Sequence, residues 1–375
     1  MNFPKTINLI EQGLSDRLHV GGQLFISRDN ETLIDHATGI ARDGVPMTPD
    51  HLHIWMSCTK PVAAVAIGQL WERGQLGLDD TVAAHIPEFG DKGKKTVTLR
   101  HLLTHTGGFR AVANSWKPAP AEQFLSDIYA ARLEPGWTPG KKAGYHVASS
   151  WYVLGEIVRR ISGRPFEQYV RDEIFGPLNM PDCWIGMPPD TYDAYGDRIA
   201  LMYTTDTSDP MPHPLWSLKD NATMCRPAAN GYGPARQFAR FYQALLNKGT
   251  LDGTRLLQPQ TVEALIARHR TGMYDHTFRH NIDWCLGFIP NNNIYGWETL
   301  PYGYGPHAGA RAFGHGGHQT SVGMADPDNG LAIVLIFNGA PGDARHNARI
   351  RATMGAIYED LGLAPDAVTD ARSPA

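Results

Sequence analysis

The stretch Trp55-Met56-Ser57-Cys58-Thr59-Lys60 precedes a segment that predicts a helix. Apolar residues recur at helical spacing from Val62 to Trp71, and the pattern ends at Gly74. A serine and a lysine three residues apart lie on one face of a helix, one turn from each other. Serine becomes a good nucleophile when a base takes its proton, and a lysine can be that base only when it is neutral. Ser57 and Lys60 are therefore candidates for a nucleophile and its base.

Two interpretations of this stretch are open. In the functional one, burial lowers the pKa of Lys60 by disfavouring the charged amine, and the N–H groups at the helix start, including that of Ser57, hold a developing oxyanion. In the other, Ser57 only caps the helix and Lys60 is solvated. Trp55 and Met56 favour burial of the motif. Cys58 points about 100° around the helix from Ser57, so we expect a small buried residue rather than a catalytic thiol.

The rest of the chain predicts strands at both ends and helices between them. Residues 22–31 and 31–39 are expected to form a hairpin. Residues 320–325 and 331–337 are expected to be strands that flank a Pro/Gly turn. Residues 186–232 are rich in Pro, Gly, Asp and Tyr and predict an ordered loop region. Further helices are predicted over residues 149–162, 234–248 and 344–361.

This order predicts an α/β (α+β) fold with one antiparallel sheet built from both chain ends. Helices are expected to flank the sheet, and a mostly helical domain is expected to be inserted. The predicted domains are residues 1–80 plus 265–375, which hold the central sheet, and residues 81–264, which are mostly helical. The active site is expected in the cleft between them.

Length and composition exclude several classes of protein. The chain has 375 residues, of which 42% are hydrophobic and 19% are charged, as in ordinary globular proteins. A net charge of −4 argues against a nucleic-acid partner, and no apolar run is long enough to span a membrane. The four cysteines form no CxxC pair, so neither a zinc site nor a disulfide framework is predicted. The start of the sequence lacks a signal-peptide pattern, so we expect a reduced, cytoplasmic protein without nucleic-acid or membrane partners.

Four stretches resemble, in order, the motifs of the serine β-lactamase-like superfamily. They are Ser57-Cys58-Thr59-Lys60-Pro61, Thr98-Leu99-Arg100-His101-Leu102-Leu103-Thr104-His105-Thr106-Gly107-Gly108, Pro139-Gly140-Lys141-Lys142-Ala143-Gly144-Tyr145 and Gly314-His315-Gly316-Gly317-His318. The resemblance is closest to the group of class C β-lactamases, D-alanyl-D-alanine carboxypeptidases and family VIII carboxylesterases. It implies a β-lactamase/transpeptidase-like fold, and no cofactor is expected.

The resemblance also implies the roles of three side chains. Ser57 would be the acylated nucleophile, Lys60 would share its proton, and Tyr145 would relay the proton to the leaving group and later activate water. A tyrosine with its ordinary pKa of about 10 acts as a base only beside a cation, and Lys60 is the candidate for that cation. Hydrogen-bonded groups of this kind titrate as a unit. Without the resemblance, Tyr145 is better explained as a core tyrosine at a helix entrance, and His315 as a strand-edge histidine.

The third motif is expected to edge the active site. The resemblance places His315, Gly316 and Gly317 on a strand beside the nucleophile. The backbone N–H of His318 would be the second oxyanion donor, next to that of Ser57. Glycine suits this place because a missing Cβ lets substrate approach the backbone closely.

Two of the motifs depart from those of β-lactamases. The second motif is usually Tyr-x-Asn, and here Val147 replaces the asparagine. The third is usually Lys-Thr-Gly, and here His315 replaces the lysine, which removes a cation for a substrate carboxylate. A site that lacks these polar groups discriminates less well in favour of amides that carry a carboxylate. The changes favour esters, which need less help with the leaving group.

The sequence therefore predicts a serine carboxylesterase that works through an acyl-enzyme on Ser57. Three alternatives are an acyltransferase or transesterase with the same acyl-enzyme, a β-lactamase or D-aminopeptidase-type amide hydrolase, and a catalytically silent binding protein. The absence of GxSxG argues against the α/β-hydrolase route to this chemistry. No metal is expected, although His101/His105 and His276/His280 are spaced like helical ligands.

Aromatic residues favour a small-molecule ester with an apolar or aromatic acyl or alcohol group. The alternative is that these side chains pack loops onto the core. The candidates for the pocket are Trp116, Trp137, Trp216, Trp284, Trp297, Tyr145, Tyr302, Tyr304 and Phe313.

Overall fold

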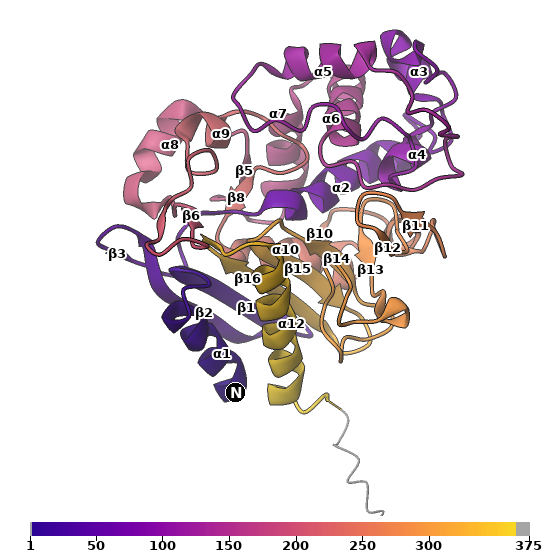
Figure 1. Cartoon of the computed structure of the whole chain (residues 1–375). Helices are drawn as coiled ribbons and strands as arrows, with labels where there is room; N and C mark the ends of the chain where they lie inside the picture. Colours follow the sequence, from indigo (N-terminus) through magenta and orange to yellow (C-terminus); the bar gives the residue numbers. More distant parts are fainter. Residues whose placement is uncertain (1, 365–375) are drawn as a thin grey trace, which may run out of the picture.

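A seven-stranded sheet lies at the centre of the computed structural model, which describes residues 2–364 (Figure 1). Its strand order is β13-β14-β15-β16-β1-β2-β3, and every neighbouring pair is antiparallel. Strands from both ends of the chain meet in this sheet, so the predicted fold class is confirmed. The strands are β1 (Gly21–Arg28), β2 (Glu31–Arg42), β3 (Val45–Pro46), β13 (Ile289–Pro290), β14 (Phe313–Gly316), β15 (Ser321–Asp326) and β16 (Leu331–Phe337).

The two predicted strand pairs are present. β1 and β2 form a hairpin whose turn places Asp29 and Asn30 at φ values of 50° and 69°. β15 and β16 flank the predicted turn, in which Gly330 has a φ of 67°. β16 then pairs with β1 in the register Gly22 to Phe337, which joins the two ends of the chain.

Different helices cover the two faces of the sheet. Because successive side chains of a strand point to opposite faces, Leu24 packs in one apolar cluster and Phe25 in the other. α1 (Pro4–Ser15) and α12 (Asp343–Asp360) lie side by side over the first face, and α10 (Ala235–Leu246) packs on the second (Figure 1). Burial on both faces explains the unbroken apolar run of β16.

The helices from the middle of the chain surround α2 (Lys60–Glu72). α2 is buried from its first residue almost to its end and packs against α6 (Ser149–Ser162) and α11 (Pro259–Ile266), which explains why it is apolar on all sides. α6 ends as predicted at Gly163, whose φ is 70°. The other helices of this part are α3 (Val82–His85), α4 (Leu99–Leu103), α5 (Ala121–Ala130), α7 (Phe166–Val170) and the π-turn η3 (Arg171–Phe175).

Residues 186–232 are more regular than predicted. The expected loop region contains several elements of two to seven residues, which are too short to show a periodicity in the sequence. They are α8 (Pro189–Tyr195), η4 (Gly196–Arg198), β6 (Tyr203–Thr204), β7 (Met211–Pro212), α9 (Lys219–Thr223) and β8 (Gly231–Gly233). The remaining short elements are β4 (His53–Ile54), η1 (Met56–Thr59), η2 (Pro87–Gly90), β5 (Trp184–Ile185), β9 (Thr250–Leu251), β10 (Thr254–Arg255), β11 (Tyr274–Asp275), β12 (His280–Asn281), η5 (Asn293–Tyr295) and β17 (Gly339–Ala340).

The division of the chain into domains 1–80 plus 265–375 and 81–264 stays a prediction. α10 comes from the segment that was predicted to be helical, and it packs directly on β15 and β16 of the sheet. Within residues 2–364, no helix is both long and apolar enough to cross a bilayer.

Candidate active site

The candidate nucleophile lies in a tight turn rather than in the α-helix itself. Met56–Thr59 forms the 3₁₀-helix η1, and α2 begins only at Lys60, so the predicted helix starts later than expected. Met56 adopts a φ of 49°, a strained conformation for a residue with a side chain. Strain of this kind persists only where neighbouring structure holds it in place.

Contacts with the third motif and with β15 hold this turn. The Cys58 thiol donates to the His315 carbonyl at 2.9 Å, and the Ser321 hydroxyl donates to the Trp55 carbonyl at 2.7 Å. Cys58 is fully buried, and burial raises the pKa of its thiol to about 12. It is therefore a packing residue, as the sequence predicts.

Three predicted site residues meet at the Ser57 hydroxyl. The Lys60 Nζ lies 3.0 Å from Ser57 Oγ, and the Tyr145 hydroxyl lies 2.8 Å from the same oxygen. Lys60 also donates to the Ala228 carbonyl at 2.9 Å. The spacing of Ser57 and Lys60 thus brings both side chains to one side of the turn, and Tyr145 reaches them from the segment before α6.

Lys60 is an amine without a counter-charge. Its side chain is completely buried, and no carboxylate among residues 2–364 forms an ion pair with it. Burial lowers the pKa of Lys60 well below its usual value. A neutral amine beside Ser57 Oγ can accept the serine proton, which is what a lysine base requires.

Tyr145 is also uncharged in this environment. Burial raises the pKa of its phenol well above its usual value. Lys60 Nζ lies 5.0 Å from the centre of the tyrosine ring, but a neutral amine does not supply the cation that would favour a phenolate. The structure therefore favours a neutral pair, with Tyr145 as a hydroxyl donor to Ser57, over the expected cation-assisted tyrosine base.

The third motif lies on β14, beside the nucleophile turn. His315 is fully buried, and its Nδ1 lies 2.6 Å from the Gly316 carbonyl oxygen. Burial lowers the pKa of His315 to about 3, so the imidazole is neutral at physiological pH. A neutral His315 cannot replace the cation that a lysine would offer to a substrate carboxylate.

The two glycines of this motif allow close packing against the turn and its surroundings. A Cβ on Gly317 would lie 2.4 Å from the Trp55 carbonyl oxygen, and one on Gly316 would lie 2.4 Å from the Tyr302 ring. The Gly317 N–H donates to the Ser321 carbonyl at 2.7 Å, so it is not free to bind an oxyanion. A side chain at position 317 would push the segment after β14 away from the nucleophile turn, and one at position 316 would displace the Tyr302 ring.

The backbone N–H groups of Ser57 and His318 are the predicted oxyanion donors. Ser57 lies in the first turn of η1, where an N–H has no intrahelical acceptor. In the part of the chain that the structure describes, the His318 N–H has no hydrogen-bond acceptor either. The His318 side chain is half-exposed, 3.6 Å from Asp343. The predicted donor pair is thus available, and its role stays a prediction.

The second motif places Val147 at the surface and His146 in the core. Val147 is 38% exposed, so no buried amide stands where the family has its asparagine. The His146 N–H donates to His105 Nδ1 at 2.9 Å, and the Phe109 N–H donates to His146 Nε2 at 3.3 Å. Both histidines therefore hold the backbone around Tyr145.

His101 and His105, whose spacing is typical of helical metal ligands, make hydrogen bonds to the backbone instead. His101 receives the Thr98 N–H at 3.1 Å and caps α4, and His105 is committed to the His146 backbone. Within residues 2–364, no group of three or more histidine, cysteine, aspartate or glutamate side chains could hold an ion.

Only some of the predicted aromatic residues lie near the reacting groups. Rings of Trp284 and Tyr302 lie 5.7 and 6.4 Å from that of Tyr145. Trp116 and Trp216 pair with each other at 6.1 Å. The other candidates lie elsewhere: Trp137 donates to the Thr106 carbonyl, Trp297 is exposed, and Tyr304 and Phe313 belong to the core.

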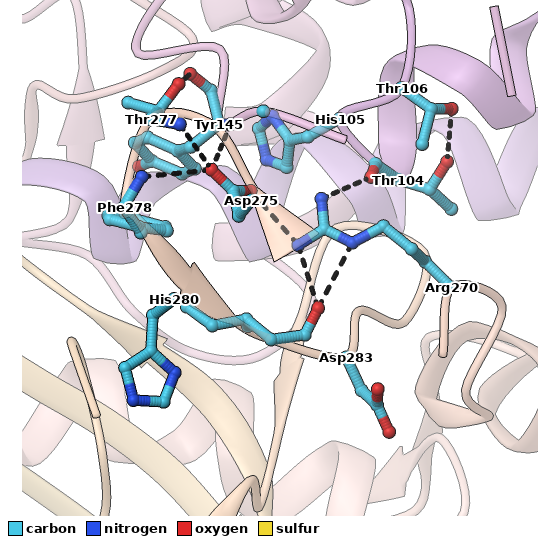
Figure 2. Close-up of polar contacts among 12 residues, drawn as sticks. Thr104, His105, Thr106, Tyr145, Arg270, Asp275, Thr277, Phe278, His280 and Asp283 are labelled. Carbon is cyan, nitrogen blue, oxygen red and sulfur yellow. Dashed lines mark hydrogen bonds and ion pairs between the residues drawn. The ribbon is translucent and has the colours of Figure 1, made fainter. Parts of the chain in front are cut away.

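One group of residues that contacts Tyr145 lies outside every motif recognised in the sequence. Asp275 accepts a hydrogen bond from the Tyr145 N–H at 3.0 Å (Figure 2). The Phe278 ring stacks on the Tyr145 ring, with the two centroids 4.6 Å apart. These residues lie in a short hairpin, β11–β12, that carries no recognisable motif. An acidic residue within an aromatic segment is the one weak signal that could have drawn attention to them.

Comparison with known proteins defines the class. The sequence model of the Beta-lactamase family matches residues 6–356, so the chain belongs to this family. It is 27% identical over 347 residues to the esterase/beta-lactamase LipL of Mycobacterium tuberculosis, with 85% of this chain and 77% of LipL covered. The fold, the family and the esterase relatives define a serine hydrolase of the β-lactamase fold.

Solved structures agree with this assignment. A penicillin-binding protein homologue from Caulobacter crescentus superposes with a TM-score of 0.80 at 31% identity, over 96% of this chain and 97% of the homologue. A family VIII carboxylesterase superposes with a TM-score of 0.78 at 26% identity, also over 96% and 97%. The resemblance expected from the four motifs is thereby confirmed.

Proposed function

We propose that this protein hydrolyses carboxylic esters through a covalent acyl-enzyme on Ser57. The observation that carries the proposal is the position of Ser57 Oγ, 3.0 Å from the Lys60 amine and 2.8 Å from the Tyr145 hydroxyl, at a site where burial keeps the amine neutral. A nucleophile with an adjacent base and a second proton carrier meets the geometric requirement of acyl transfer.

In the proposed acylation step, Lys60 takes the proton of Ser57 while Oγ bonds to the ester carbon. The N–H groups of Ser57 and His318 bind the resulting oxyanion. The bond to the alkoxide then breaks, and the alkoxide takes a proton from Tyr145. The proton held on Lys60 restores the phenol.

Deacylation reverses these roles with water in place of the alcohol. The attacking water passes a proton to the Tyr145 oxygen while the phenol passes its own proton to the Lys60 amine, and the water oxygen bonds to the acyl carbon. The bond to Ser57 Oγ breaks, and the serine recovers a proton from the same pair. The products are the carboxylic acid and the free enzyme.

Two features support an ester rather than an amide as substrate. His315 is neutral and Val147 carries no amide, so the site lacks the groups expected to hold an amide substrate with a carboxylate. The names of LipL and of the family VIII carboxylesterase point in the same direction. Because the chain is also similar to a penicillin-binding protein homologue, amides and lactams are the alternative substrates to be tested.

The aromatic surroundings support a small ester with an apolar or aromatic group. Phe278 and Tyr302 lie beside the Tyr145 ring, at 4.6 and 6.4 Å. The location in the cytoplasm and the absence of a cofactor, a nucleic-acid partner and a membrane partner stay predictions.

The proposal is tested by replacing the nucleophile. Ser57→Ala should abolish hydrolysis of p-nitrophenyl butyrate and labelling by a fluorophosphonate probe. Ser150→Ala is the matched control, because Ser150 is also buried and its hydroxyl has no partner among residues 2–364. Turnover by the Ser57→Ala protein, or a label on another peptide, would overturn the covalent mechanism.

A substrate panel separates the alternatives. The wild-type protein should hydrolyse p-nitrophenyl esters much faster than p-nitroanilides or the lactam nitrocefin. A preference for the anilide or for nitrocefin would favour the amide hydrolase. Transfer of the acyl group to added alcohols or amines in excess of hydrolysis would favour the acyltransferase.

A further inference from the structure

We propose that the buried ion pair of Arg270 and Asp275 positions Tyr145 for proton transfer, an inference that rests on the proposed function. Neither residue touches Ser57, and neither belongs to the four motifs. Their effect on the reaction would pass through the main chain of Tyr145. They are therefore proposed as positioning residues.

Asp275 gathers backbone N–H groups around one carboxylate oxygen. Its Oδ1 accepts the N–H groups of Tyr145 at 3.0 Å, Thr277 at 2.9 Å and Phe278 at 3.0 Å (Figure 2). The first bond joins residues 130 positions apart in the sequence. The other two fix the turn that follows Asp275, so the carboxylate ties this turn to Tyr145.

Arg270 holds the carboxylate from the other side. Its Nη2 lies 3.1 Å from Asp275 Oδ2, and the two side chains are 1% and 0% exposed. Its Nη1 donates to the Thr104 carbonyl at 3.0 Å, and its Nη2 donates to the Ile282 carbonyl at 3.0 Å. A buried charge pair needs further hydrogen bonds. Arg270 makes them to two carbonyls and Asp275 makes them through Oδ1, whereas Oδ2 faces Arg270 as an ion pair and has no hydrogen bond within residues 2–364.

The turn also holds the rest of Tyr145. The Thr277 hydroxyl donates to the Tyr145 carbonyl at 3.0 Å, and the His276 N–H donates to the Ala143 carbonyl at 2.9 Å. The ring lies between Phe278, with centroids 4.6 Å apart, and His105, with centroids 4.7 Å apart.

Both backbone polar groups and the ring of Tyr145 are thus fixed. Because its hydroxyl must meet Ser57 Oγ, a small displacement of this main chain would lengthen the 2.8 Å contact. Proton transfer to the leaving alkoxide would then suffer more than substrate binding.

A second ion pair on the same segment provides the matched control. Asp283 pairs with Arg268 at 2.6 Å and accepts the Gly272 N–H at 2.8 Å and the Tyr295 hydroxyl at 2.8 Å. Figure 2 shows its carboxylate pointing away from Arg270 and Asp275. Asp283 makes contacts of the same kind as Asp275 but has no hydrogen bond to Tyr145.

The experiment compares Asp275→Asn with Asp283→Asn on two esters of one acid, a p-nitrophenyl ester and an ethyl ester. A misplaced proton donor matters more when the leaving alkoxide is more basic. We expect Asp275→Asn to lower kcat/KM about 10-fold for the p-nitrophenyl ester and about 100-fold for the ethyl ester, with KM nearly unchanged. Asp283→Asn should change both esters by the same factor.

Thr277→Val is a milder variant if Asp275→Asn does not fold. It removes the hydroxyl that donates to the Tyr145 carbonyl and keeps the shape of the side chain. It should shift the ratio of the two kcat/KM values in the same direction, and Thr277→Ser should restore the ratio. An unchanged ratio in the folded Asp275 or Thr277 variant would overturn the positioning role.

Tyr145→Phe separates this inference from the proposed function. If Tyr145→Phe leaves the ratio of the two esters at the wild-type value, the proton relay in the proposed function is wrong. If Tyr145→Phe shifts the ratio and the Asp275 variant does not, only the positioning role is wrong.

Discussion

The turn that carries Ser57 and the backbone that carries Tyr145 are built in different ways. Ser57 and Lys60 belong to one continuous stretch, and their three-residue spacing places Nζ 3.0 Å from Oγ. Tyr145 lies in irregular chain before α6 and is held by residues from two distant segments, around His105 and Asp275. The difference shows that the pairing of Ser57 with Lys60 depends mainly on local sequence, whereas the position of Tyr145 depends on tertiary contacts.

The two regions also differ in how their buried ionisable side chains are accommodated. Lys60 is buried among groups that include no carboxylate partner within residues 2–364, and burial lowers its pKa well below the usual value, which favours the neutral amine. Around Tyr145, the buried charges Arg270 and Asp275 are kept and paired. The Lys60 amine that contacts Ser57 is therefore uncharged. The charged side chains, Arg270 and Asp275, do not contact Ser57 and instead hold the backbone of Tyr145.

The largest loss of activity is expected when Lys60, in the continuous stretch with Ser57, is replaced. Lys60→Met removes the base and keeps the length of the side chain, so kcat/KM for p-nitrophenyl butyrate should fall by about 10³-fold. Steady-state kinetics on folded protein measures the loss. Lys94→Met is the control, because Lys94 is also buried, with its pKa lowered to about 8, and its amine donates to the Tyr129 carbonyl at 3.1 Å rather than to a site residue. Equal losses in the two variants would contradict the role of Lys60.

The next effect tests the packing of the nucleophile turn against β14. A Cβ at position 317 would lie 2.4 Å from the Trp55 carbonyl oxygen, so Gly317→Ala should cost about 1–3 kcal/mol of unfolding free energy. It should also lower kcat/KM because the strand of the third motif is displaced. Gly303→Ala, whose nearest contact would be an ordinary 3.4 Å, should do neither. Urea unfolding and ester kinetics measure both; a Gly317→Ala protein as stable as wild type would contradict the close contact.

A pH experiment sharpens the electrostatic side of the comparison. The unfolded chain protonates Lys60 below a pKa of 10.5, whereas the native state holds the amine neutral down to a lower pH. Between these two values, unfolding takes up a proton, so wild-type stability should rise with pH by at most about 1.4 kcal/mol per unit. Lys60→Met lacks this contribution, so the unfolding free energy of wild type should rise relative to that of Lys60→Met between pH 7 and pH 9. A constant difference in urea unfolding would mean that native Lys60 is charged.

The smallest effect concerns an exposed residue two positions after Tyr145. Val147 is 38% exposed, so Val147→Asn should change the unfolding free energy by no more than about 0.5 kcal/mol. It restores the amide of the family's second motif and should raise anilide turnover relative to ester turnover by a few-fold. Val147→Thr, a polar control without the amide, should leave the ratio unchanged.

The fold and part of the site could be predicted because they depend on local patterns. The β1–β2 hairpin, the strands around the Asp326 turn and the SxxK stretch each occupy short, continuous segments. Residues 186–232 could not be resolved into α8, α9 and β6–β8, because such short elements show no periodicity. Asp275 could not be assigned, because its meaning depends on a contact across 130 positions. The neutrality of His315 was expected, whereas the neutrality of Tyr145 depended on burial that no sequence pattern shows.

The pairing of β1 with β16 has a consequence for the synthesis of this protein. During translation, Gly22 leaves the ribosome long before its partner Phe337, so the hairpin of β1 and β2 waits with an unpaired edge while the helices between them are made. Contacts between such distant residues fold slowly, because a long loop must close before they form. Chains that stop before β16 would lack the centre of the sheet, and they should be targets for chaperones and proteases.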